Sequence, residues 1–481
     1  MITIINDISL IFPEITILVT AIITLFTDLF NHKNDKSLIY CITLLGLTIA
    51  AGSCLLLFGG SKLILFSGLL ISDDSAQLMK IFIILSVFLS LFYSRDYLNQ
   101  RDIPIGDYCV LSLFSTLGML ILVSAYSLLT IYLGVELLSL PLYAMITIQK
   151  NCNNANEAAL KYFIMGSIAS GLLLYGLSFV YGITGQLELL PIANTITSHW
   201  HNNHLLLTFA IVFIVTGIGF KLAAAPFHMW TPDVYEGSPT AVTIFLSAAP
   251  KIAAIGMALR VLTFALAEIA IDWQQLLIIM SVLSIGIGNL LAIVQNNIKR
   301  LLSYSAISHI GYILFGLIAI NNDGYSSSLY YILIYALMAI AAFGLIIILS
   351  QHNTELTDVR QLSGLNKRHP WLAFMMLIVM FSMAGVPPTV GFFAKLLVLT
   401  ALINTHIIWL AVFGLIFAVV GAYYYLRIVK IMYFDEITTD TINQVILTPS
   451  LIGIYSLNCL SLLYLGLFPF HLISICNQMF N

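Results

Sequence analysis

The feature that most constrains this chain is a series of fourteen apolar runs. Each is long enough for an α-helix to cross the hydrocarbon core of a bilayer, which takes roughly 17–25 residues. Of the 481 residues, 60% are hydrophobic and only 9% are charged, whereas soluble domains carry roughly 25% charged residues. The sequence therefore predicts an all-α polytopic membrane protein with spans at residues 13–31, 38–58, 75–93, 108–124, 126–148, 158–182, 205–229, 240–264, 275–296, 300–320, 326–350, 371–404, 407–434 and 448–472.

The lysines and arginines between these runs are unevenly distributed. If the fourteen helices alternate in direction, 12 of the 19 Lys and Arg residues lie on one side, Lys62 alone lies on the other, and six lie within helices. Positive residues concentrate on the cytoplasmic side of membrane proteins. We therefore expect both termini on the non-cytoplasmic side. The N-terminal sequence has no positive region of the kind that begins a signal peptide, so we expect a retained first helix.

Two predicted helices are interrupted by prolines beside a lysine. Pro226 follows Lys221 by five residues, and Pro387 and Pro388 shortly precede Lys395. Proline removes a backbone donor and clashes with the preceding turn, so both helices are expected to break. Broken backbone at membrane depth is tolerated only where it is buried in protein or lines a water-filled cavity.

The two broken helices lie five helix steps apart and therefore cross the membrane in opposite directions. Paired broken helices in inverted units indicate a transport site. We therefore predict helices 1–3 within residues 1–107, a first repeat of helices 4–8 at 108–264, a second, inverted repeat of helices 9–13 at 275–434, and a last helix within 448–481.

Five ionisable residues lie well inside predicted helices: Glu136, Lys221, Lys251, His309 and Lys395. A charge at the bilayer centre costs about 2.5–3.5 kcal/mol even on the lenient insertion scale. Burial disfavours the ammonium form and a nearby carboxylate favours it, so a lysine between these influences can load and release a proton. The pattern predicts a proton relay. The alternative, a Glu136–Lys221 ion pair that only fixes packing, does not account for the other lysines.

Three further basic residues, Lys80, Lys161 and Arg260, lie within reach of a helix end. Long basic side chains in such positions commonly extend to the membrane interface, and this is the expectation for all three. Lys161 is also retained as a candidate member of the relay.

Sequence signals for a bound cofactor are missing. The six cysteines form no C-x-x-C pair and no His/Cys cluster at metal spacing, and the sequence contains no P-loop or dinucleotide fingerprint. We expect no redox cofactor, nucleotide or metal in this chain, and no nucleic-acid partner because there is no basic patch.

Five stretches together resemble one family. They are GVELLSLPLY with Glu136, EAALKYFIMGSIASG with Lys161, GFKLAAAPFHMWTPDVYEGSPTAVTIFLSAAPKIA with Lys221 and Lys251, QNNIKRLLSYSAISHIGY with His309, and MAGVPPTVGFFAKLLVL with Lys395. The chain resembles the antiporter-like membrane subunits of respiratory complex I, the proton-translocating NADH–quinone oxidoreductase. TPDVYEG and Lys395 favour the subunit N branch.

The resemblance implies a function and partners. By this resemblance, Glu136 and Lys221 would form a pair that switches between proton-loaded and proton-free states. Lys251 would be the central lysine of the relay. His309 would pass protons between the two halves of the subunit, and Lys395 would belong to the half through which protons leave. Other subunits would carry FMN, iron–sulfur clusters, NADH and quinone, and the chain would lie among the other membrane subunits in a bacterial inner membrane. A subunit of a multi-subunit cation/proton antiporter is the alternative, and a membrane scaffold with no transport role is a third.

Overall fold

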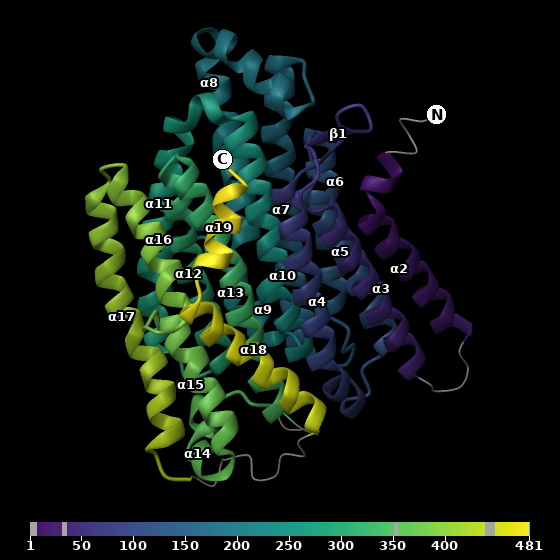
Figure 1. Ribbon diagram of the computed structural model, residues 1–481, viewed down its shortest axis with the longest axis vertical. Coiled ribbons are helices and arrows are strands. Elements are labelled where there is room, and N and C mark those ends of the chain that lie inside the picture. The colour runs from purple at the N-terminus through teal and green to yellow at the C-terminus, as the bar shows by residue number, and fades with distance from the viewer. Residues whose placement is uncertain (1–6, 31–35, 351–354, 438–447, 481) are drawn as a thin grey trace. The chain divides into compact units, whose positions relative to one another are not determined.

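The computed structural model describes residues 7–30, 36–350, 355–437 and 448–480. The described residues are almost entirely helical (Figure 1). The helices are α2 (Phe12–Phe30), α3 (Lys36–Leu57), α4 (Asp74–Gln100), α5 (Ile105–Val123), α6 (Leu128–Ile146), α7 (Asn153–Thr184), α8 (Leu189–Leu222), α9 (Trp230–Gly237), α10 (Thr240–Ala258), α11 (Ala270–Val294), α12 (Ile298–Ile318), α13 (Asn322–Leu349), α14 (Leu365–Arg368), α15 (Pro370–Ala384), α16 (Val390–Asn404), α17 (Ile408–Tyr433), α18 (Pro449–Leu467) and α19 (Phe470–Gln478). Shorter elements are the π-helix η1 (Leu259–Ala265) and the 3₁₀ segments η2 (Ala267–Ile269) and η3 (Val359–Leu362).

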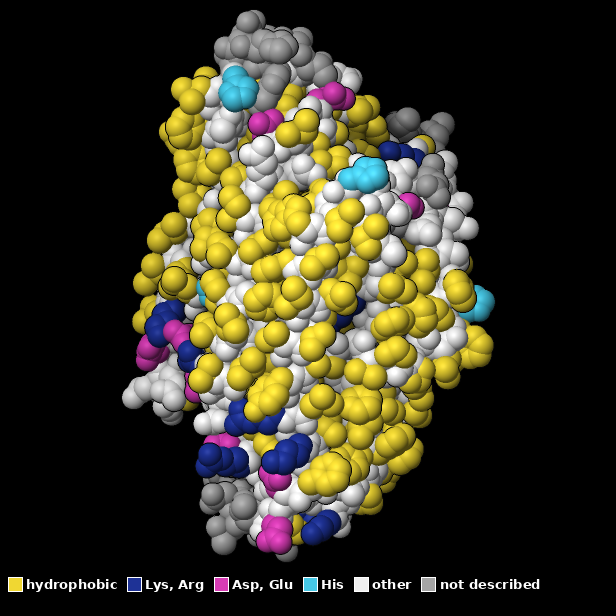
Figure 2. All heavy atoms as spheres, turned by 90° about the vertical axis from the view of Figure 1, so that its left-hand side faces the viewer, with side chains coloured by type: hydrophobic (Ala, Val, Ile, Leu, Met, Phe, Trp, Pro, Cys, Tyr) yellow, Lys and Arg dark blue, Asp and Glu magenta, His cyan; other side chains and the backbone are white. Residues whose placement is uncertain are grey.

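Thirteen helices in the described part of the chain are long and apolar enough to cross a membrane. The shorter apolar helices α15 and α16 occupy the predicted twelfth span, so the fourteen predicted segments are all accounted for. Figure 2 shows hydrophobic side chains over most of one face, with charged side chains gathered toward its lower end. Such a surface is typical of a multi-pass membrane protein, in which exposed apolar side chains contact lipid. Val419, for example, is 72% exposed.

The chain packs as two compact units. Unit 1 comprises Met1–Leu91, Ile103–Leu222 and Ala249–Leu276, and unit 2 comprises Phe92–Asp102, Ala223–Ala248 and Leu277–Asn481. These units describe packing and do not test the predicted repeats, which stay a prediction.

Unit 1 is built from adjacent antiparallel helices. α5 packs along α6, α7 along α8, and α2 against both α3 and α5. The close approach of α5 to α6 depends on Gly118, because a Cβ there would lie 2.4 Å from the backbone nitrogen of Leu138. A hairpin of β1 (Leu63–Leu65) and β2 (Leu70–Ser72) precedes α4, with Leu63 opposite Ser72.

Unit 2 is arranged around α13, which contacts α12, α15, α16, α18 and α19 (Figure 1). The most apolar 18-residue window of α13 is fully buried, as is that of α12. A helix that is apolar on all sides belongs in the interior of a membrane bundle, and the sequence of α13 has this character.

Both predicted breaks are present, and both contain a cis X–Pro bond, Ala225–Pro226 and Pro387–Pro388. α8 ends at Leu222 and α9 begins at Trp230. α15 ends at Ala384, where Gly385 with φ +83° stops the helix, and α16 begins at Val390.

Several predicted boundaries are wrong by five residues or more; α4, for example, ends at Gln100, seven residues beyond the predicted end at 93. Two differences bear on the fold. α8 begins at Leu189, 16 residues before the predicted start at 205, because its first half is polar and gives no apolar signal. The last predicted span is interrupted: α18 ends at Leu467, and α19 begins at Phe470 directly after Pro469, which cannot continue a helix.

Candidate functional site

Lys221 lies in the last turn of α8, at the first break. Its Nζ donates a hydrogen bond of 2.7 Å to Oγ of Ser139 on α6. Glu136 lies one turn before Ser139 on the same helix, so its carboxylate shares that face. Among the described residues, the ion pairs do not include Glu136 with Lys221, and Oε1 of Glu136 is buried without a hydrogen-bond donor. The lysine is therefore held by a hydroxyl within reach of a carboxylate.

Lys251 lies in the interior of α10 and is 1% exposed. Pro250 directly precedes it inside the helix. The 18 most apolar consecutive residues of the span that contains this lysine are all buried, so protein and not lipid surrounds it.

His309 lies in the middle of α12 and is 3% exposed. Its Nδ1 shares a hydrogen bond of 2.9 Å with the hydroxyl of Tyr331, and its Nε2 shares one of 3.0 Å with the hydroxyl of Tyr425. The Tyr425 hydroxyl in turn lies 2.5 Å from Oγ of Ser305. The imidazole is thus part of a continuous row of hydroxyls contributed by α12, α13 and α17.

Lys395 lies in the second turn of α16, just after the second break. Its Nζ donates to the backbone carbonyls of Met383 at 3.2 Å and Ala384 at 2.8 Å, which end α15. The C-terminus of a helix carries a partial negative charge that favours a cation. The ammonium also lies 5.4 Å from the centre of the Tyr312 ring, which adds a cation–π contact.

Lys161 has a different environment from the other relay candidates. Its side chain on α7 is 40% exposed and forms an ion pair of 2.9 Å with Glu157, one turn earlier on the same helix. Its membership of the relay stays a prediction.

The expectation that Lys80 and Arg260 reach the membrane interface is wrong. Lys80 is 1% exposed and pairs with Glu14 at 2.6 Å. Arg260 binds Asp73 through two bonds of 2.6 and 2.7 Å. Arg260 holds the pKa of Asp73 at about 2, below its usual value, against the effect of burial. The partners lie far away in sequence, so the spacing gave no signal for either pair.

The TPDVYEG segment forms α9, and its acidic residues bind α12. Arg300 donates to Asp233 at 2.9 Å and to Glu236 at 2.7 Å, and Asn297 donates to Glu236 at 2.9 Å. The acidic residues of this segment therefore dock one short helix onto the helix that carries His309. From the sequence alone, this segment indicated only the family resemblance, because its docking contacts join distant parts of the chain.

Glu355 forms a second cluster in unit 2. Lys299 approaches its carboxylate at 2.7 Å and Arg101 at 3.6 Å, while Tyr97 donates to it at 3.2 Å and Thr240 also donates to it. Burial raises the pKa of Glu355, but Lys299, Thr240 and Arg101 outweigh it and lower this pKa to about 2. The cluster ties the segment after α13 to the starts of α10 and α12.

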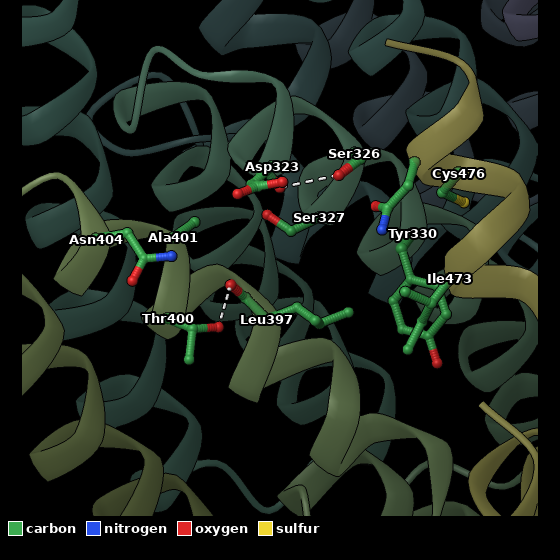
Figure 3. A pocket seen from close by; sticks show the side chains of 11 residues that line it. Asp323, Ser326, Ser327, Tyr330, Leu397, Thr400, Ala401, Asn404, Ile473 and Cys476 are labelled. Atoms are coloured by element: carbon green, nitrogen blue, oxygen red, sulfur yellow. Dashed lines mark hydrogen bonds between the residues drawn. The ribbon is translucent and has the colours of Figure 1, made fainter. Parts of the chain in front are cut away.

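Unit 2 has a cavity at each end of α13. The first, of about 220 Å³, lies between the start of α13, the end of α16 and α19. Figure 3 shows Asp323 and Asn404 at this cavity with Ser326 and Ser327; the Ser326 hydroxyl donates to the Asp323 carbonyl at 3.0 Å. Tyr330, 1% exposed, lines it from within. The second, of about 230 Å³, lies at the other end of the helix.

Within residues 7–30, 36–350, 355–437 and 448–480, no three His, Cys, Asp or Glu side chains gather to hold a metal ion. The assignment of all redox groups to other subunits stays a prediction.

Comparison with known proteins supports membership of the family that the sequence motifs resemble. The family model described as "NADH:quinone oxidoreductase/Mrp antiporter, TM" matches residues 125–421. The chain is 45% identical to NADH-quinone oxidoreductase subunit N of Nitrosomonas europaea over 95% of each chain. It is 44% identical to the subunit N of Coxiella burnetii, also over 95% of each.

Solved structures of complex I and Mrp membrane subunits have the same fold as this chain. A chain of respiratory complex I from Thermus thermophilus, determined with bound Aureothin, superposes with a TM-score of 0.82 at 30% identity, over 96% of this chain and 98% of that one. A chain of the Mrp complex from Dietzia sp. shares the fold at a TM-score of 0.86 and 19% identity, over 99% and 97%.

The fold, the two broken helices and the matched family model define a class, the antiporter-like membrane subunits common to NADH:quinone oxidoreductases and Mrp antiporters. Identity over nearly the full length then narrows the class. The chain belongs to the NADH-quinone oxidoreductase subunit N family.

Proposed function

We propose that this chain translocates protons as a membrane-arm subunit of a bacterial NADH–quinone oxidoreductase (complex I). Other subunits would carry FMN and iron–sulfur clusters and pass electrons from NADH to quinone. The observation that supports this most strongly is Lys395, buried at a helix break with its ammonium on two backbone carbonyls. A buried lysine at such a break has the chemistry to hold a proton and release it when its surroundings change.

The proposed relay assigns a role to each buried residue. Glu136 and Lys221 form the switching pair, with Ser139 as the hydroxyl that holds the lysine between transfers. Lys251 carries the proton through the centre, His309 transfers it, and Lys395 serves the outlet half. Lys161 is an outer member beside Glu157.

The predicted repeats and topology belong to the same proposal. The first repeat contains α5–α8 and α10, and the second contains α11–α13, α15, α16 and α17. Both termini lie on the non-cytoplasmic side of the inner membrane, supported by the 12-to-1 distribution of Lys and Arg between the two sides. The other membrane subunits of the complex cover the apolar faces that lipid does not.

The test uses the complete complex in inverted membrane vesicles. Lys221→Met and Lys395→Met should each abolish NADH-driven proton uptake in complexes that assemble as the wild type does on native gels. A scaffold would tolerate both changes, since an apolar side chain of similar length is easily accommodated in a membrane bundle.

The cation/proton antiporter is the second candidate, because the matched family model covers both protein groups. It predicts that this chain co-purifies with membrane subunits that oxidise no NADH. Isolation of the chain with NADH–quinone oxidoreductase activity would reject it.

A further inference from the structure

Asn289 on α11 is a buried amide beside the hydroxyls that surround His309, and its side chain is 2% exposed. Its Nδ2 donates to the backbone carbonyl of Ile285 at 2.9 Å and to Oγ of Ser308 at 2.8 Å. Its Oδ1 accepts a hydrogen bond of 3.2 Å from the hydroxyl of Tyr424. The amide therefore connects α11 to α12 and α17 within unit 2.

The backbone determines which way this amide points. A carbonyl oxygen only accepts hydrogen bonds, so the amide atom that faces the Ile285 carbonyl must be the nitrogen, and Oδ1 must face Tyr424. Gly421 on α17 leaves room for this oxygen, because a Cβ there would lie 2.5 Å from Oδ1 of Asn289. The Tyr424 hydroxyl carries one proton, and that proton is therefore donated to Asn289.

Tyr424 also adjoins the hydroxyls that lead to His309. Its ring centre lies 4.2 Å from that of Tyr425. Its hydroxyl is within hydrogen-bonding reach of the hydroxyls of Tyr425 and Ser305. Because its only proton is donated to Asn289, Tyr424 can accept from these two groups but cannot donate to them.

The protons on these hydroxyls then decide which nitrogen of a neutral His309 is protonated. If Tyr425 donates to Tyr424, it has no proton left for Nε2 of His309. If Ser305 donates to Tyr424, the 2.5 Å bond between Ser305 and Tyr425 requires Tyr425 to donate, with the same result. In both cases Nε2 is protonated and donates to Tyr425 at 3.0 Å, while Nδ1 is bare and accepts from Tyr331 at 2.9 Å. The other tautomer leaves the Tyr424 hydroxyl without a donor among these groups.

We propose that Asn289 is a positioning residue that holds His309 in the tautomer protonated at Nε2, acting through the hydroxyls of Tyr424 and Tyr425. The proposal rests on the proposed function, since this tautomer matters only if His309 transfers protons. With Nδ1 bare, the ring takes a proton from Tyr331 and releases the Nε2 proton to Tyr425, so it gains one proton and loses one. After each transfer the fixed amide favours return to the same tautomer.

The test replaces Asn289 in the complete complex labelled with ¹⁵N-histidine. Nitrogen magnetic resonance distinguishes protonated from bare ring nitrogens, and subtraction of the His309→Gln spectrum identifies the signals of His309. The wild type should be protonated mainly at Nε2. Asn289→Leu nearly keeps the volume but releases the Tyr424 proton, and we expect the tautomer ratio to move roughly fivefold towards Nδ1, as the loss of one hydrogen bond predicts. NADH-driven proton uptake by inverted vesicles should slow about twofold, because only the fraction in the starting tautomer accepts a proton.

Two further variants show whether Asn289 acts through Tyr424. Ser308→Ala removes the other side-chain partner of Asn289 while the Ile285 carbonyl still holds the amide, so it should keep the wild-type tautomer ratio and uptake. Tyr424→Phe removes the hydroxyl itself and should shift the tautomers as Asn289→Leu does. The double variant should shift them no further, because both changes break the same connection.

The outcomes separate this proposal from the proposed function. A wild type protonated mainly at Nδ1, or an unchanged ratio in Asn289→Leu, overturns the positioning role and leaves the function standing if Lys395→Met loses uptake. An equal shift in Ser308→Ala would show that loosened packing is responsible and also overturns it. If Asn289→Leu fails to assemble, an unchanged ratio in an assembled Tyr424→Phe complex has the same meaning. Wild-type uptake in Lys395→Met overturns the function itself.

Discussion

The two broken helices use the same sequence device, a lysine beside a proline break, in two different ways. Lys221 precedes its break and is held by a side-chain hydroxyl, that of Ser139 on a neighbouring helix. Lys395 follows its break and is held by the carbonyls that end α15. The first partner, the Ser139 hydroxyl, itself donates to the Val135 carbonyl at 2.5 Å and can rotate away once that single hydrogen bond is broken, while the second is fixed backbone.

This difference indicates a division of labour. A hydroxyl that both donates and accepts, one turn from the carboxylate of Glu136, allows the lysine to exchange partners. Two carbonyls accept only, and with the helix dipole they favour the charged ammonium in one place. We infer that the site in unit 1 is the adjustable one and that the site in unit 2 is the fixed one.

The largest effect is expected from removing either ammonium. Lys221→Met and Lys395→Met should each lower proton uptake per NADH oxidised by roughly 100-fold, within the range that a positioned proton-transfer group contributes. Vesicle acidification measured beside NADH oxidation checks this. Wild-type proton uptake in both variants would contradict the proposed difference between the two sites, because neither lysine would then carry protons.

The two units should share their response to acid. Asp73 in unit 1 and Glu355 in unit 2 each have a pKa of about 2, below the ordinary values of 3.8 and 4.5. Their stabilisation, about 2 to 3 kcal/mol each by linkage, is present above the ordinary pKa. It is lost as the pH falls from about 5 towards 2.

The measurement is the melting temperature of the purified complex as a function of pH. Asp73→Asn and Glu355→Gln should each melt lower at pH 7 and approach the wild type at pH 3. A difference from the wild type that does not change with pH would show that packing, and not the charge, is responsible.

The two residues with left-handed backbone at the breaks, Gly385 and Ala223, should differ in their response to substitution. Gly385 has φ +83°, and a Cβ there would lie 2.9 Å from Cδ of Lys395. Gly385→Ala should destabilise the protein by about 1–2 kcal/mol and lower proton uptake by displacing the lysine. Ala223 already occupies φ +65°, so Ala223→Gly should change stability little, because relief of strain offsets the added freedom of the unfolded chain. Melting temperatures of the two variants decide this.

The smallest effect is expected at the hydroxyl that holds Lys221. Ser139→Ala should cost about 1 kcal/mol of stability and slow proton uptake only a few-fold, since the lysine itself remains. Ser115→Ala on α5, whose hydroxyl donates to the carbonyl of Leu138, is a matched control that should leave uptake unchanged. A loss in Ser139→Ala as severe as in Lys221→Met would show that the hydroxyl itself carries the proton.

Much of the fold follows from the sequence because its determinants are local. The length of an apolar run decides whether a helix spans, and prolines favour a break, so breaks were predicted near Pro226 and Pro387, where α8 and α15 end. Proline alone is not sufficient, since α10 continues through Pro250. The buried positions of Lys251, His309 and Lys395 follow in the same way. The unpredicted first half of α8 is the exception, since a polar helix has no such local signal.

The partners of the charged residues could not be predicted, because they depend on contacts between distant segments. Lys80 pairs with Glu14, 66 positions earlier, and Arg260 with Asp73, 187 positions earlier. Ser139 gave no signal either, since one hydroxyl among many in apolar helices is ordinary. Both cavities around α13 likewise form only when three helices converge.

The histidine in α12 is held through both ring nitrogens, and this has a consequence for repeated use. A neutral imidazole has one protonated nitrogen and one bare nitrogen. On the proposed relay, a proton arriving from Tyr331 at Nδ1 and leaving from Nε2 to Tyr425 leaves the ring in the opposite tautomer, with both hydroxyls turned. A second proton cannot follow in the same direction until ring and hydroxyls have been restored. His309 would therefore pass one proton at a time, and its ring and the two neighbouring hydroxyls would have to return to their starting orientations before the next.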